Sequence, residues 1–320
     1  MTTARDPGFV SRLRAAVHGR VTASEPLARF STYRIGGPAT LFQPADSTDL
    51  AAGLAAAAHE GIPVFVLGLG SNVLLPDGGL DALVVRIGKG LDDIRQDGPR
   101  WVLGAGAPAP VVARRTAEAG WAGLEVMVGV PGTVGGGVYM NAGCHGGQWS
   151  DVVRAVVALD RTGVERRVEG SEIPFTYRRS GLGDLIVIQA DVELAPGDPL
   201  ELGAEMKRLF GWRQRGTPFN QACCGSVFKN PAWPNGAGPA GPDLRTAGQL
   251  IEAAGLKGKR AGAVEVSPMH ANYFVNLGGG RAGEVRELMA RVVAGVEARF
   301  GVVLEPEVKV IGVLGEIAAW

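Results

Sequence analysis

The chain has few of the residues that define several common classes of protein. Its 320 residues include three cysteines and four histidines, too few for a disulfide framework. Cys144, Cys223 and Cys224 also lack the Cys-x-x-Cys and Cys/His spacings of zinc sites. Lys and Arg together number 32, as do Asp and Glu, so no net field attracts nucleic acid. We therefore predict no metal site and small-molecule rather than nucleic-acid partners.

Long apolar runs are missing as well. The N-terminus lacks the apolar core of a signal peptide, and no uninterrupted apolar stretch is long enough to cross a bilayer. A hydrophobic content of 46% in 320 residues still suffices for two or three compact units. We predict a cytoplasmic protein that does not bind membranes and is a monomer.

Glycine is abundant, and one glycine-rich stretch dominates the sequence. Residues Gly129–Gly143 read G-V-P-G-T-V-G-G-G-V-Y-M-N-A-G. Glycine allows φ > 0 and lets a flat or phosphorylated ligand lie against the main chain, and successive N–H groups can hold a pyrophosphate. Val130, Val134 and Val138 are not typical of a flexible linker. The stretch therefore predicts a ligand-binding loop.

A second loop of this kind, Gly68–Asn72, follows the apolar run Val64–Leu67, which we predict to be a buried strand. It resembles a dinucleotide fingerprint only superficially, because Val73 stands where G-x-G-x-x-G needs its third glycine. The following residues are apolar and do not predict a helix. A Rossmann domain is therefore disfavoured.

The remaining pattern combines strand–helix units with later hairpins, which predicts an α+β fold. Asp160–Gly163 is a turn signal between two β-branched runs and indicates a hairpin. Pro196–Pro199 ends the first domain. We predict strands at 41–42, 64–67, 82–87, 101–103, 152–159, 164–168, 185–194, 263–266, 273–277 and 303–311, and helices at 47–59 (with Ser47 as N-cap), 108–119, 200–215, 243–254 and around 285–300.

Two features of the second domain have plain explanations. In the last helix Val285, Leu288, Met289, Val292, Val293, Val296 and Phe300 recur at three- and four-residue steps, which is typical of a core-facing stripe. Residues 231–242 are rich in Gly and Pro without a period and indicate an exposed insertion.

Seven motifs, taken together and in order, resemble the family of UDP-N-acetylenolpyruvoylglucosamine reductases (MurB), flavoenzymes of peptidoglycan synthesis. The motifs are T-Y-R-I-G-G-P at 32–38, G-L-G-S-N at 68–72, G-V-P-G-T-V-G-G-G-V-Y-M-N-A-G at 129–143, Y-R-R-S at 177–180, G-S-V-F-K-N-P at 225–231, S-P-M-H-A-N-Y at 267–273 and L-E-P-E-V at 304–308.

The resemblance implies a fold, cofactors and a reaction. It implies an N-terminal segment (1–28), a vanillyl-alcohol-oxidase or PCMH-type FAD-binding domain of two α+β subdomains (29–198) and a C-terminal α+β substrate domain (199–320). The implied reaction is reduction of UDP-N-acetylglucosamine enolpyruvate to UDP-N-acetylmuramate, with non-covalent FAD and with NADPH as hydride donor. The short spacing from Arg178 to Ser226 implies the type II form, without an added substrate-covering tyrosine loop.

Three catalytic residues follow from the resemblance. Hydride addition to the vinyl carbon leaves negative charge on the substrate carboxylate, which Arg178 would stabilise. Ser226 would protonate the resulting carbanionic carbon, and Glu307 would orient the enol or assist that proton transfer. From the residues alone, the better explanation of Arg178 is a surface arginine, and it is not distinguishable from Arg179. Glu307 alternates along 303–311 with apolar residues, as an ordinary solvent-facing glutamate also would.

The resemblance also implies two sets of binding residues. For the cofactor they are Tyr33, Gly68, Gly70, Ser71, Asn72, Pro131, Gly132, Thr133, Gly135, Gly136, Asn141 and Gly143. For the substrates they are Tyr177, Lys229, Asn230, His270 and Asn272. Lys229 could favour the alkoxide left on Ser226, and His270 could instead make a structural hydrogen bond.

Other classes fit less well. Ser226 as a hydrolase nucleophile lacks a G-x-S-x-G elbow. An FAD oxidase of the same fold, acting on an alcohol or sugar, would share both glycine loops but would not require Arg178, Ser226 and Glu307 together. A non-enzymatic interaction protein would explain neither loop. Cys223 and Cys224 are interpreted as inert small residues rather than redox groups, because no activating neighbour is evident.

Overall fold

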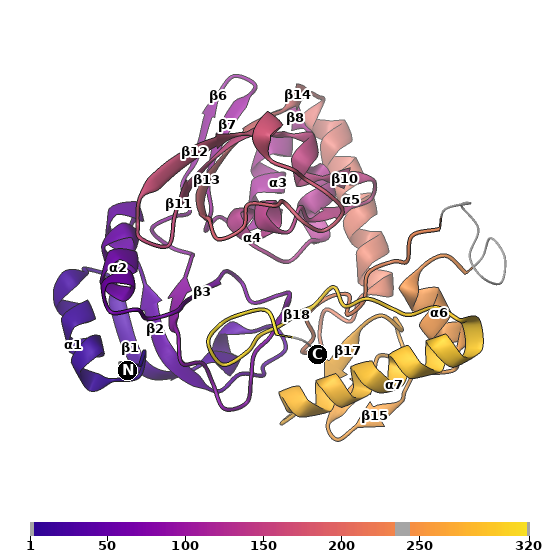
Figure 1. The fold of residues 1–320 in the computed structure, drawn as a ribbon. Coiled ribbons are helices and arrows are strands. Elements are labelled where there is room, and N and C mark those ends of the chain that lie inside the picture. The colour runs from indigo at the N-terminus through magenta and orange to yellow at the C-terminus, as the bar shows by residue number, and fades with distance from the viewer. Residues whose placement is uncertain (1–2, 234–243, 319–320) are drawn as a thin grey trace. The chain divides into compact units, whose positions relative to one another are not determined.

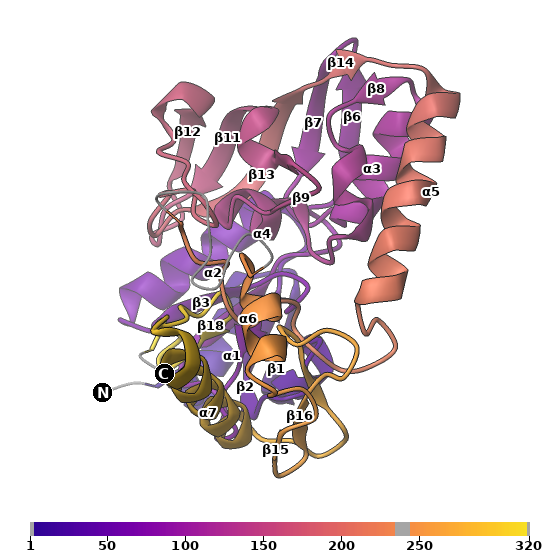
Figure 2. The same ribbon diagram turned by 90° about the vertical axis from the view of Figure 1, so that its right-hand side faces the viewer.

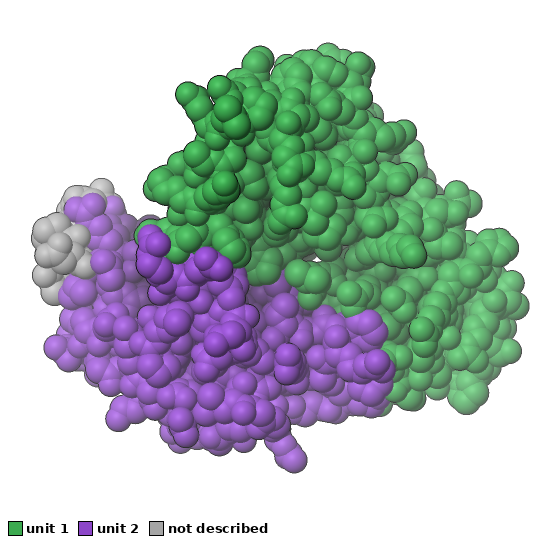
Figure 3. Space-filling model, turned by 180° about the vertical axis from the view of Figure 1, so that it is seen from behind, with its two compact units in different colours: residues 1–25, 39–69, 80–213 green, residues 26–38, 70–79, 214–320 purple. Residues whose placement is uncertain are grey.

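A computed structural model describes residues 3–233 and 244–318 of the chain, which forms two compact units (Figure 3). Unit 1 comprises residues 1–25, 39–69 and 80–213, and unit 2 comprises 26–38, 70–79 and 214–320. These bounds differ from the predicted domains, because two early segments belong to unit 2. The reason is hydrophobic: Tyr33, Ile35 and Leu74 are buried in the unit 2 core.

The first sheet of unit 1 has four strands in the order β1-β2-β5-β3. Figure 1 labels β1, β2 and β3. Strands β2 and β3 both pair in parallel with β5, which lies between them. The predicted strand at 64–67 is confirmed, and the one at 82–87 is slightly shorter than predicted. The strands are β1 (Arg20–Pro26), β2 (Pro38–Gln43), β3 (Val64–Leu67) and β5 (Leu83–Arg86).

Two helices accompany this sheet, α1 (Pro7–Ala16) and α2 (Ser47–His59). The N-cap of α2 is Asp46, one residue before the predicted Ser47, and its side chain accepts a hydrogen bond from Asp49 N at 2.8 Å. The helix ends before Gly61, as predicted, where φ is +66°.

The second sheet of unit 1 is antiparallel, with five strands in the order β12-β11-β13-β7-β6. The predicted hairpin is confirmed, because β11 and β12 pair on either side of the turn at 160–163. The strands are β6 (Ile94–Asp97), β7 (Arg100–Gly104), β11 (Val153–Leu159), β12 (Glu165–Glu169) and β13 (Ile186–Glu193).

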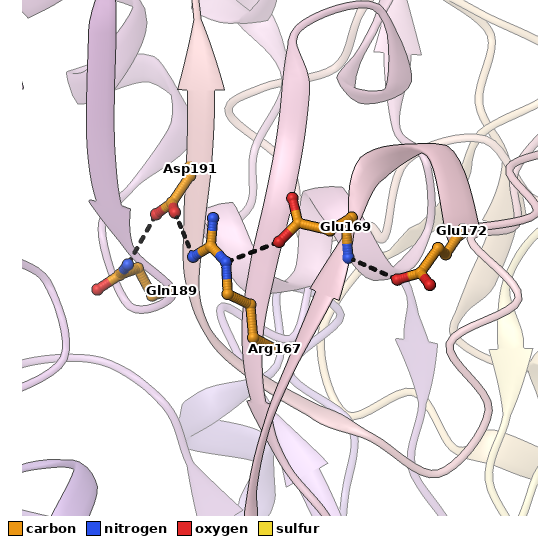
Figure 4. A network of polar contacts seen from close by, with 5 residues as sticks. All are labelled: Arg167, Glu169, Glu172, Gln189 and Asp191. Atoms are coloured by element: carbon orange, nitrogen blue, oxygen red, sulfur yellow. Dashed lines mark hydrogen bonds and ion pairs between the residues drawn. The ribbon is translucent and has the colours of Figure 1, made fainter.

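A polar network supports the register of this sheet (Figure 4). Arg167 on β12 donates to Asp191 on β13 at 2.7 Å, across the intervening β11, and to Glu169 at 2.8 Å. Gln189 donates to the same Asp191 carboxylate at 2.7 Å. Because the Arg167 side chain is 52% exposed, each ion pair stabilises by at most about 1 kcal/mol.

Three helices complete unit 1 (Figure 2): α3 (Ala109–Glu118), α4 (Val134–Tyr139) and α5 (Pro199–Gly216), which crosses the boundary at residue 213. The helices predicted at 108–119 and 200–215 are confirmed. The glycine-rich stretch predicted as a loop contains α4, which packs against β7 and β13. The short elements are β8 (Trp121–Ala122), η2 (Glu125–Gly129), β9 (Gly143–Cys144), β10 (Gly147–Gln148), η3 (Trp149–Asp151), η4 (Gly170–Glu172) and β14 (Ala195–Pro196).

In the described residues of unit 2, β15, β16 and β17 form an antiparallel sheet, and α6 and α7 are α-helices. The stripe predicted for the last helix is confirmed: its five buried positions from Val285 to Val296 face the core, with Val293 and Phe300 partly buried against it. The elements are η1 (Leu27–Phe30), β4 (Val73–Leu74), α6 (Ala247–Ala253), β15 (Arg260–Ala261), β16 (Val264–Val266), β17 (Phe274–Asn276), α7 (Ala282–Phe300) and β18 (Lys309–Val310).

Two predictions in unit 2 need correction or lie outside the described residues. The strand predicted over 303–311 is reduced to β18, which pairs in parallel with the equally short β4. Most of the predicted insertion, residues 234–242, and the predicted helix start at Asp243 lie outside the described residues. Among the described helices, none combines the length and apolar character needed to cross a membrane.

Candidate active site

The glycines of α4 fall into two kinds. A Cβ atom on Gly137 would overlap the Trp149 indole, and one on Gly135 would lie 2.8 Å from the Ala105 Cβ. Packing therefore requires glycine at both positions. A Cβ on Gly136 would meet only the Thr133 Oγ1, at 3.5 Å. Packing therefore does not require glycine at position 136.

The surface around Gly136 has little side-chain cover. Pro131, Gly136 and Tyr139 are exposed, whereas Thr133 is buried and caps α4 by accepting from Gly136 N at 3.3 Å. At the end of β3, a Cβ on Gly68 would lie 2.8 Å from the same Thr133 Oγ1. Bare main chain at Gly136 fits a flat ring system such as a flavin, which can approach the backbone closely there.

Asn141 follows α4 and uses its side chain within the protein. Its Nδ2 donates to Thr176 O at 3.1 Å and to Gln148 Oε1 at 3.3 Å, and its Oδ1 accepts from Ser150 N at 3.0 Å. The residue is 1% exposed and has a φ of +41°, which asparagine tolerates better than most residues. The amide therefore holds three separate segments together.

Arg178 lies in a tight turn that Asn141 contacts. Thr176 N donates to Arg179 O at 2.8 Å and Arg179 N to Thr176 O at 3.1 Å, so Tyr177 and Arg178 are the central residues. Arg178 has a φ of +59°, a conformation that favours glycine at this turn position. Its Nη2 donates to Gly143 O at 3.0 Å, and its guanidinium lies 4.7 Å from the centre of the Tyr177 ring.

In unit 2 the structure brings the segments of Ser226 and Glu307 together. Phe228 and Pro306 form an antiparallel bridge, Glu307 N donates to Val227 O at 2.8 Å, and Lys229 N donates to Glu305 O at 2.8 Å. Ser226 and Glu307 are both half-buried. Of the three predicted catalytic residues, these two share unit 2, and Arg178 belongs to unit 1.

Two asparagines form hydrogen bonds to these two segments. The Asn272 side chain accepts from Phe228 N at 2.9 Å and donates to Phe228 O at 2.8 Å. Asn72 Nδ2 donates to Glu307 O at 3.3 Å, and Asn72 O accepts from Lys309 N at 3.0 Å. Both side chains satisfy main-chain groups beside the predicted catalytic residues.

The other predicted substrate residues of unit 2 form hydrogen bonds or an ion pair within that unit. Lys229 Nζ lies 3.2 Å from Glu305 Oε2, and Asn230 Oδ1 accepts from Ala247 N at 3.1 Å at the start of α6. His270 Nδ1 accepts from Asn272 N at 3.1 Å, which is the structural hydrogen bond considered as the alternative for this histidine. Their roles toward a substrate stay predictions.

Tyr33 lies inside unit 2, beside the two adjacent cysteines. It is fully buried, and burial raises its pKa well above the usual value, with Cys224 and Cys223 adding to the shift. Burial likewise raises the pKa of the Cys224 thiol, and Cys223 and Glu307 add to it. A neutral thiol is a poor nucleophile, which agrees with an inert Cys224.

The first predicted cofactor loop is divided between the units, since Gly68 belongs to unit 1 and Gly70, Ser71 and Asn72 to unit 2. Gly70 has a φ of +68°, and a Cβ there would overlap Phe30 O, so this glycine is required by the backbone. A Cβ on Gly225, next to Ser226, would lie 3.9 Å from Ser71 O.

Two further predicted cofactor residues use their main chain within the protein. Gly132 O accepts a hydrogen bond from Ala109 N. Gly143 pairs with Gln148 in the β9–β10 hairpin.

Sequence reasoning missed Gln148, Thr176 and Ser150, which bind the Asn141 amide. None of them lies in a recognised motif, and Thr176 is 35 residues away from Asn141, so no local pattern connects the two. No group of three or more His, Cys, Asp or Glu side chains suited to a metal ion occurs in the part of the chain that the structure describes.

Comparison with known proteins gives consistent matches along the chain. Residues 38–169 match the FAD binding domain family, and residues 217–311 match the UDP-N-acetylenolpyruvoylglucosamine reductase C-terminal domain family. The UDP-N-acetylenolpyruvoylglucosamine reductase of Rubrobacter xylanophilus is 45% identical over 294 residues, covering 90% of this chain and 94% of that protein. The one from Azorhizobium caulinodans is 42% identical and covers 98% of this chain and 99% of that protein.

A solved structure agrees with the sequence relatives. The crystal structure of UDP-N-acetylenolpyruvylglucosamine reductase (MurB) from Thermus caldophilus matches with a TM-score of 0.77 and 33% identity. The match covers 92% of this chain and 99% of that chain. Together with the FAD-binding family match, it confirms the predicted α+β fold with a PCMH-type FAD-binding domain.

Proposed function

The chain belongs to the UDP-N-acetylenolpyruvoylglucosamine reductase family, and from that premise we propose how its residues carry out the reaction. The protein is an oxidoreductase of peptidoglycan precursor synthesis. It reduces UDP-N-acetylglucosamine enolpyruvate to UDP-N-acetylmuramate, with FAD as cofactor and NADPH as hydride donor. The bound FAD supplies the transfer of hydride from NADPH to the vinyl carbon of the substrate.

Arg178 binds the substrate carboxylate. Negative charge spreads onto this carboxylate as the vinyl carbon is reduced, and a planar guanidinium can hold both oxygens while the charge grows. The two-residue turn and the hydrogen bond from Nη2 to Gly143 O support this role, because they restrict the side chain before substrate arrives.

Ser226 donates the proton that completes the reduction. The acceptor is a basic carbon, so even a weak acid such as a serine hydroxyl can serve when it is held in place. Glu307 orients the enol beside it. The antiparallel pairing of residues 227–229 with 305–307 supports this pairing of roles, since it fixes the spacing between the two segments.

The bare main chain at Gly136 and the end of β3 at Gly68 would hold the cofactor in unit 1. Gly136 is the observation that carries this part of the proposal, because no packing contact requires glycine there. Gly135 and Gly143 instead serve packing and the β9–β10 hairpin. We further propose a cytoplasmic monomer of the type II form, consistent with small, soluble substrates.

A spectroscopic titration tests the function. The purified protein is expected to be yellow, to bleach with NADPH in the absence of oxygen, and to regain its colour when UDP-N-acetylglucosamine enolpyruvate is added. Protein that takes up no FAD would contradict the cofactor assignment. Recovery with oxygen or a simple alcohol, and none with the enolpyruvyl substrate, would support the oxidase alternative.

A further inference from the structure

We propose that Asn141 is a positioning residue for Arg178, and not a cofactor contact as its motif predicts. The proposal deepens the proposed function and rests on it. Its basis is the hydrogen-bond pattern of the Asn141 side chain, which joins the end of the glycine-rich stretch to the turn that carries Arg178.

The orientation of the Asn141 amide is fixed by its partners. Ser150 N is a donor, so the side-chain atom that receives it at 3.0 Å is the oxygen. The Nδ2 group therefore faces two acceptors, Thr176 O at 3.1 Å and Gln148 Oε1 at 3.3 Å. Both of its hydrogens have a protein acceptor, and with the residue 1% exposed the amide has no accessible face for a ligand.

The turn at 176–179 is held at three points. Asn141 holds Thr176, Tyr139 O accepts from Ser180 N at 3.1 Å, and Gly143 O accepts from the Arg178 guanidinium at 3.0 Å. Residues 139, 141 and 143 all belong to one short stretch. That stretch is therefore a template for the turn, and Asn141 is its only side chain among these three contacts.

The backbone of Arg178 explains why a template is needed. A φ of +59° is uncommon for a residue other than glycine, and surrounding contacts must maintain it. Loss of the Asn141 amide would release Thr176, whose carbonyl also closes the turn by accepting from Arg179 N at 3.1 Å. The Arg178 side chain would then lose its fixed direction.

Asn141→Asp is the diagnostic change. Aspartate has the same shape, tolerates positive φ and can still accept from Ser150 N, but it places a carboxylate oxygen against two acceptor oxygens. We expect flavin reoxidation by UDP-N-acetylglucosamine enolpyruvate to slow by about 10- to 100-fold, the scale of effect that misplacing a catalytic group by about 1 Å produces. Flavin bleaching by NADPH and the Kd for FAD should change less than about threefold.

A double-mutant cycle distinguishes positioning from general loss of structure. If Asn141 acts through Arg178, adding Asn141→Asp to an Arg178→Ala enzyme should slow reoxidation by less than about twofold, whereas independent effects would multiply. Thr40→Val is the matched control, because it removes another buried hydrogen bond of unit 1, from Thr40 Oγ1 to Ala4 O at 2.6 Å. It should leave the ratio of the two half-reactions unchanged.

Each outcome has a defined meaning. An Asn141→Asp enzyme whose flavin is reoxidised at the normal rate would overturn the proposal. An Asn141→Asp enzyme with reduced FAD affinity would also overturn it, because that result would support Asn141 as a cofactor contact. If Asn141→Asp does not fold, Asn141→Gly deletes the amide while permitting the φ of +41°, and the same measurements apply. A wild-type flavin that the enolpyruvyl substrate fails to reoxidise would instead contradict the proposed function.

Discussion

The two kinds of glycine in α4 allow the stability of unit 1 to be separated from its affinity for FAD. Gly136 and Gly137 are neighbours in the same helix, so an alanine at either has the same intrinsic effect on the helix. Reducing the freedom of the unfolded chain by Gly→Ala stabilises by about 0.4–1 kcal/mol where the site accepts a methyl group. Only the surroundings of the new Cβ atom differ between the two positions.

Gly136→Ala should stabilise the protein without cofactor. Its Cβ would lie 3.5 Å from Thr133 Oγ1, an ordinary contact, so the gain of up to about 1 kcal/mol is retained. For a unit of this size, that raises the melting temperature by about 2–4 °C. If FAD lies on this face, the same methyl group intrudes on it at a cost of about 1–3 kcal/mol, which weakens binding by roughly 5- to 150-fold.

Gly137→Ala should lower the stability of the protein without cofactor. Its Cβ would overlap the indole of Trp149, which is 1% exposed and cannot move aside freely. Overpacking of this kind costs about 1–3 kcal/mol, a fall of roughly 2–12 °C in melting temperature. Thermal unfolding of the cofactor-free protein and fluorescence titration with FAD measure the two effects separately. A Gly136→Ala protein that binds FAD as tightly as the wild type would refute the assignment of this face to the cofactor.

Three further predictions concern unit 2. Ser226→Ala should bleach normally with NADPH but regain colour about 10²- to 10⁴-fold more slowly with the enolpyruvyl substrate, and stopped-flow absorbance showing normal recovery would exclude it as the acid. Asn272→Ala removes two buried hydrogen bonds to the main-chain N–H and C=O of Phe228 and should lower the free energy of unfolding, measured in urea, by about 2–6 kcal/mol. The exposed Asn230→Ala removes one hydrogen bond, is the control, and should cost about 1 kcal/mol. Burial raises the pKa of Cys224 and Tyr33, so the unfolded chain loses these protons at lower pH than the folded chain does. The free energy of unfolding should therefore fall as the pH rises above about 8.5, where an ordinary thiol ionises. Cys224→Ala should flatten that fall between pH 8 and 10, and an unchanged slope would contradict the buried neutral thiol.

Regular elements were predictable where the pattern is local. The run at Val64–Leu67 and the turn at Asp160–Gly163 carry their own signals, a short apolar strand and a turn between β-branched residues, and both match the structure. The stripe on α7 is likewise a property of one helix. Periodicity shows which face of a helix is apolar, and the apolar face of α7 packs in the core of unit 2.

Elements that depend on distant partners were predicted less well. Alternation over 303–311 indicates a long strand, but β4 offers β18 only two residues to pair with, so most of the run stays irregular. The boundaries of the units differ for the same reason. Tyr33 and Leu74 pack with residues more than 140 positions later, and composition near position 28 gives no sign of that.

The asparagines show where a motif identifies a residue without giving its role. Asn72, Asn141 and Asn272 all lie in motifs that predict ligand contacts, and all three side chains bond to main-chain groups beside Glu307, Arg178 or Ser226. An amide can both donate and accept, which suits it equally to a ligand and to an unpaired peptide group. Only the partners, 35 to 235 residues away, distinguish the two uses.

The discontinuous make-up of unit 2 has a consequence for synthesis on the ribosome. Its first two segments end at Gly79, and the chain rejoins the unit only at Gln214. At translation rates of about 5–20 residues per second, synthesis of residues 80–213 takes roughly 7–27 s, so Tyr33, Ile35 and Leu74 emerge at least that long before the rest of the unit 2 core. Unit 1 can fold during that interval, but the apolar side chains of the first two unit 2 segments stay exposed until the rest of their core is synthesised. A fragment truncated to begin at residue 214 would lack part of its own interior and should aggregate when expressed alone.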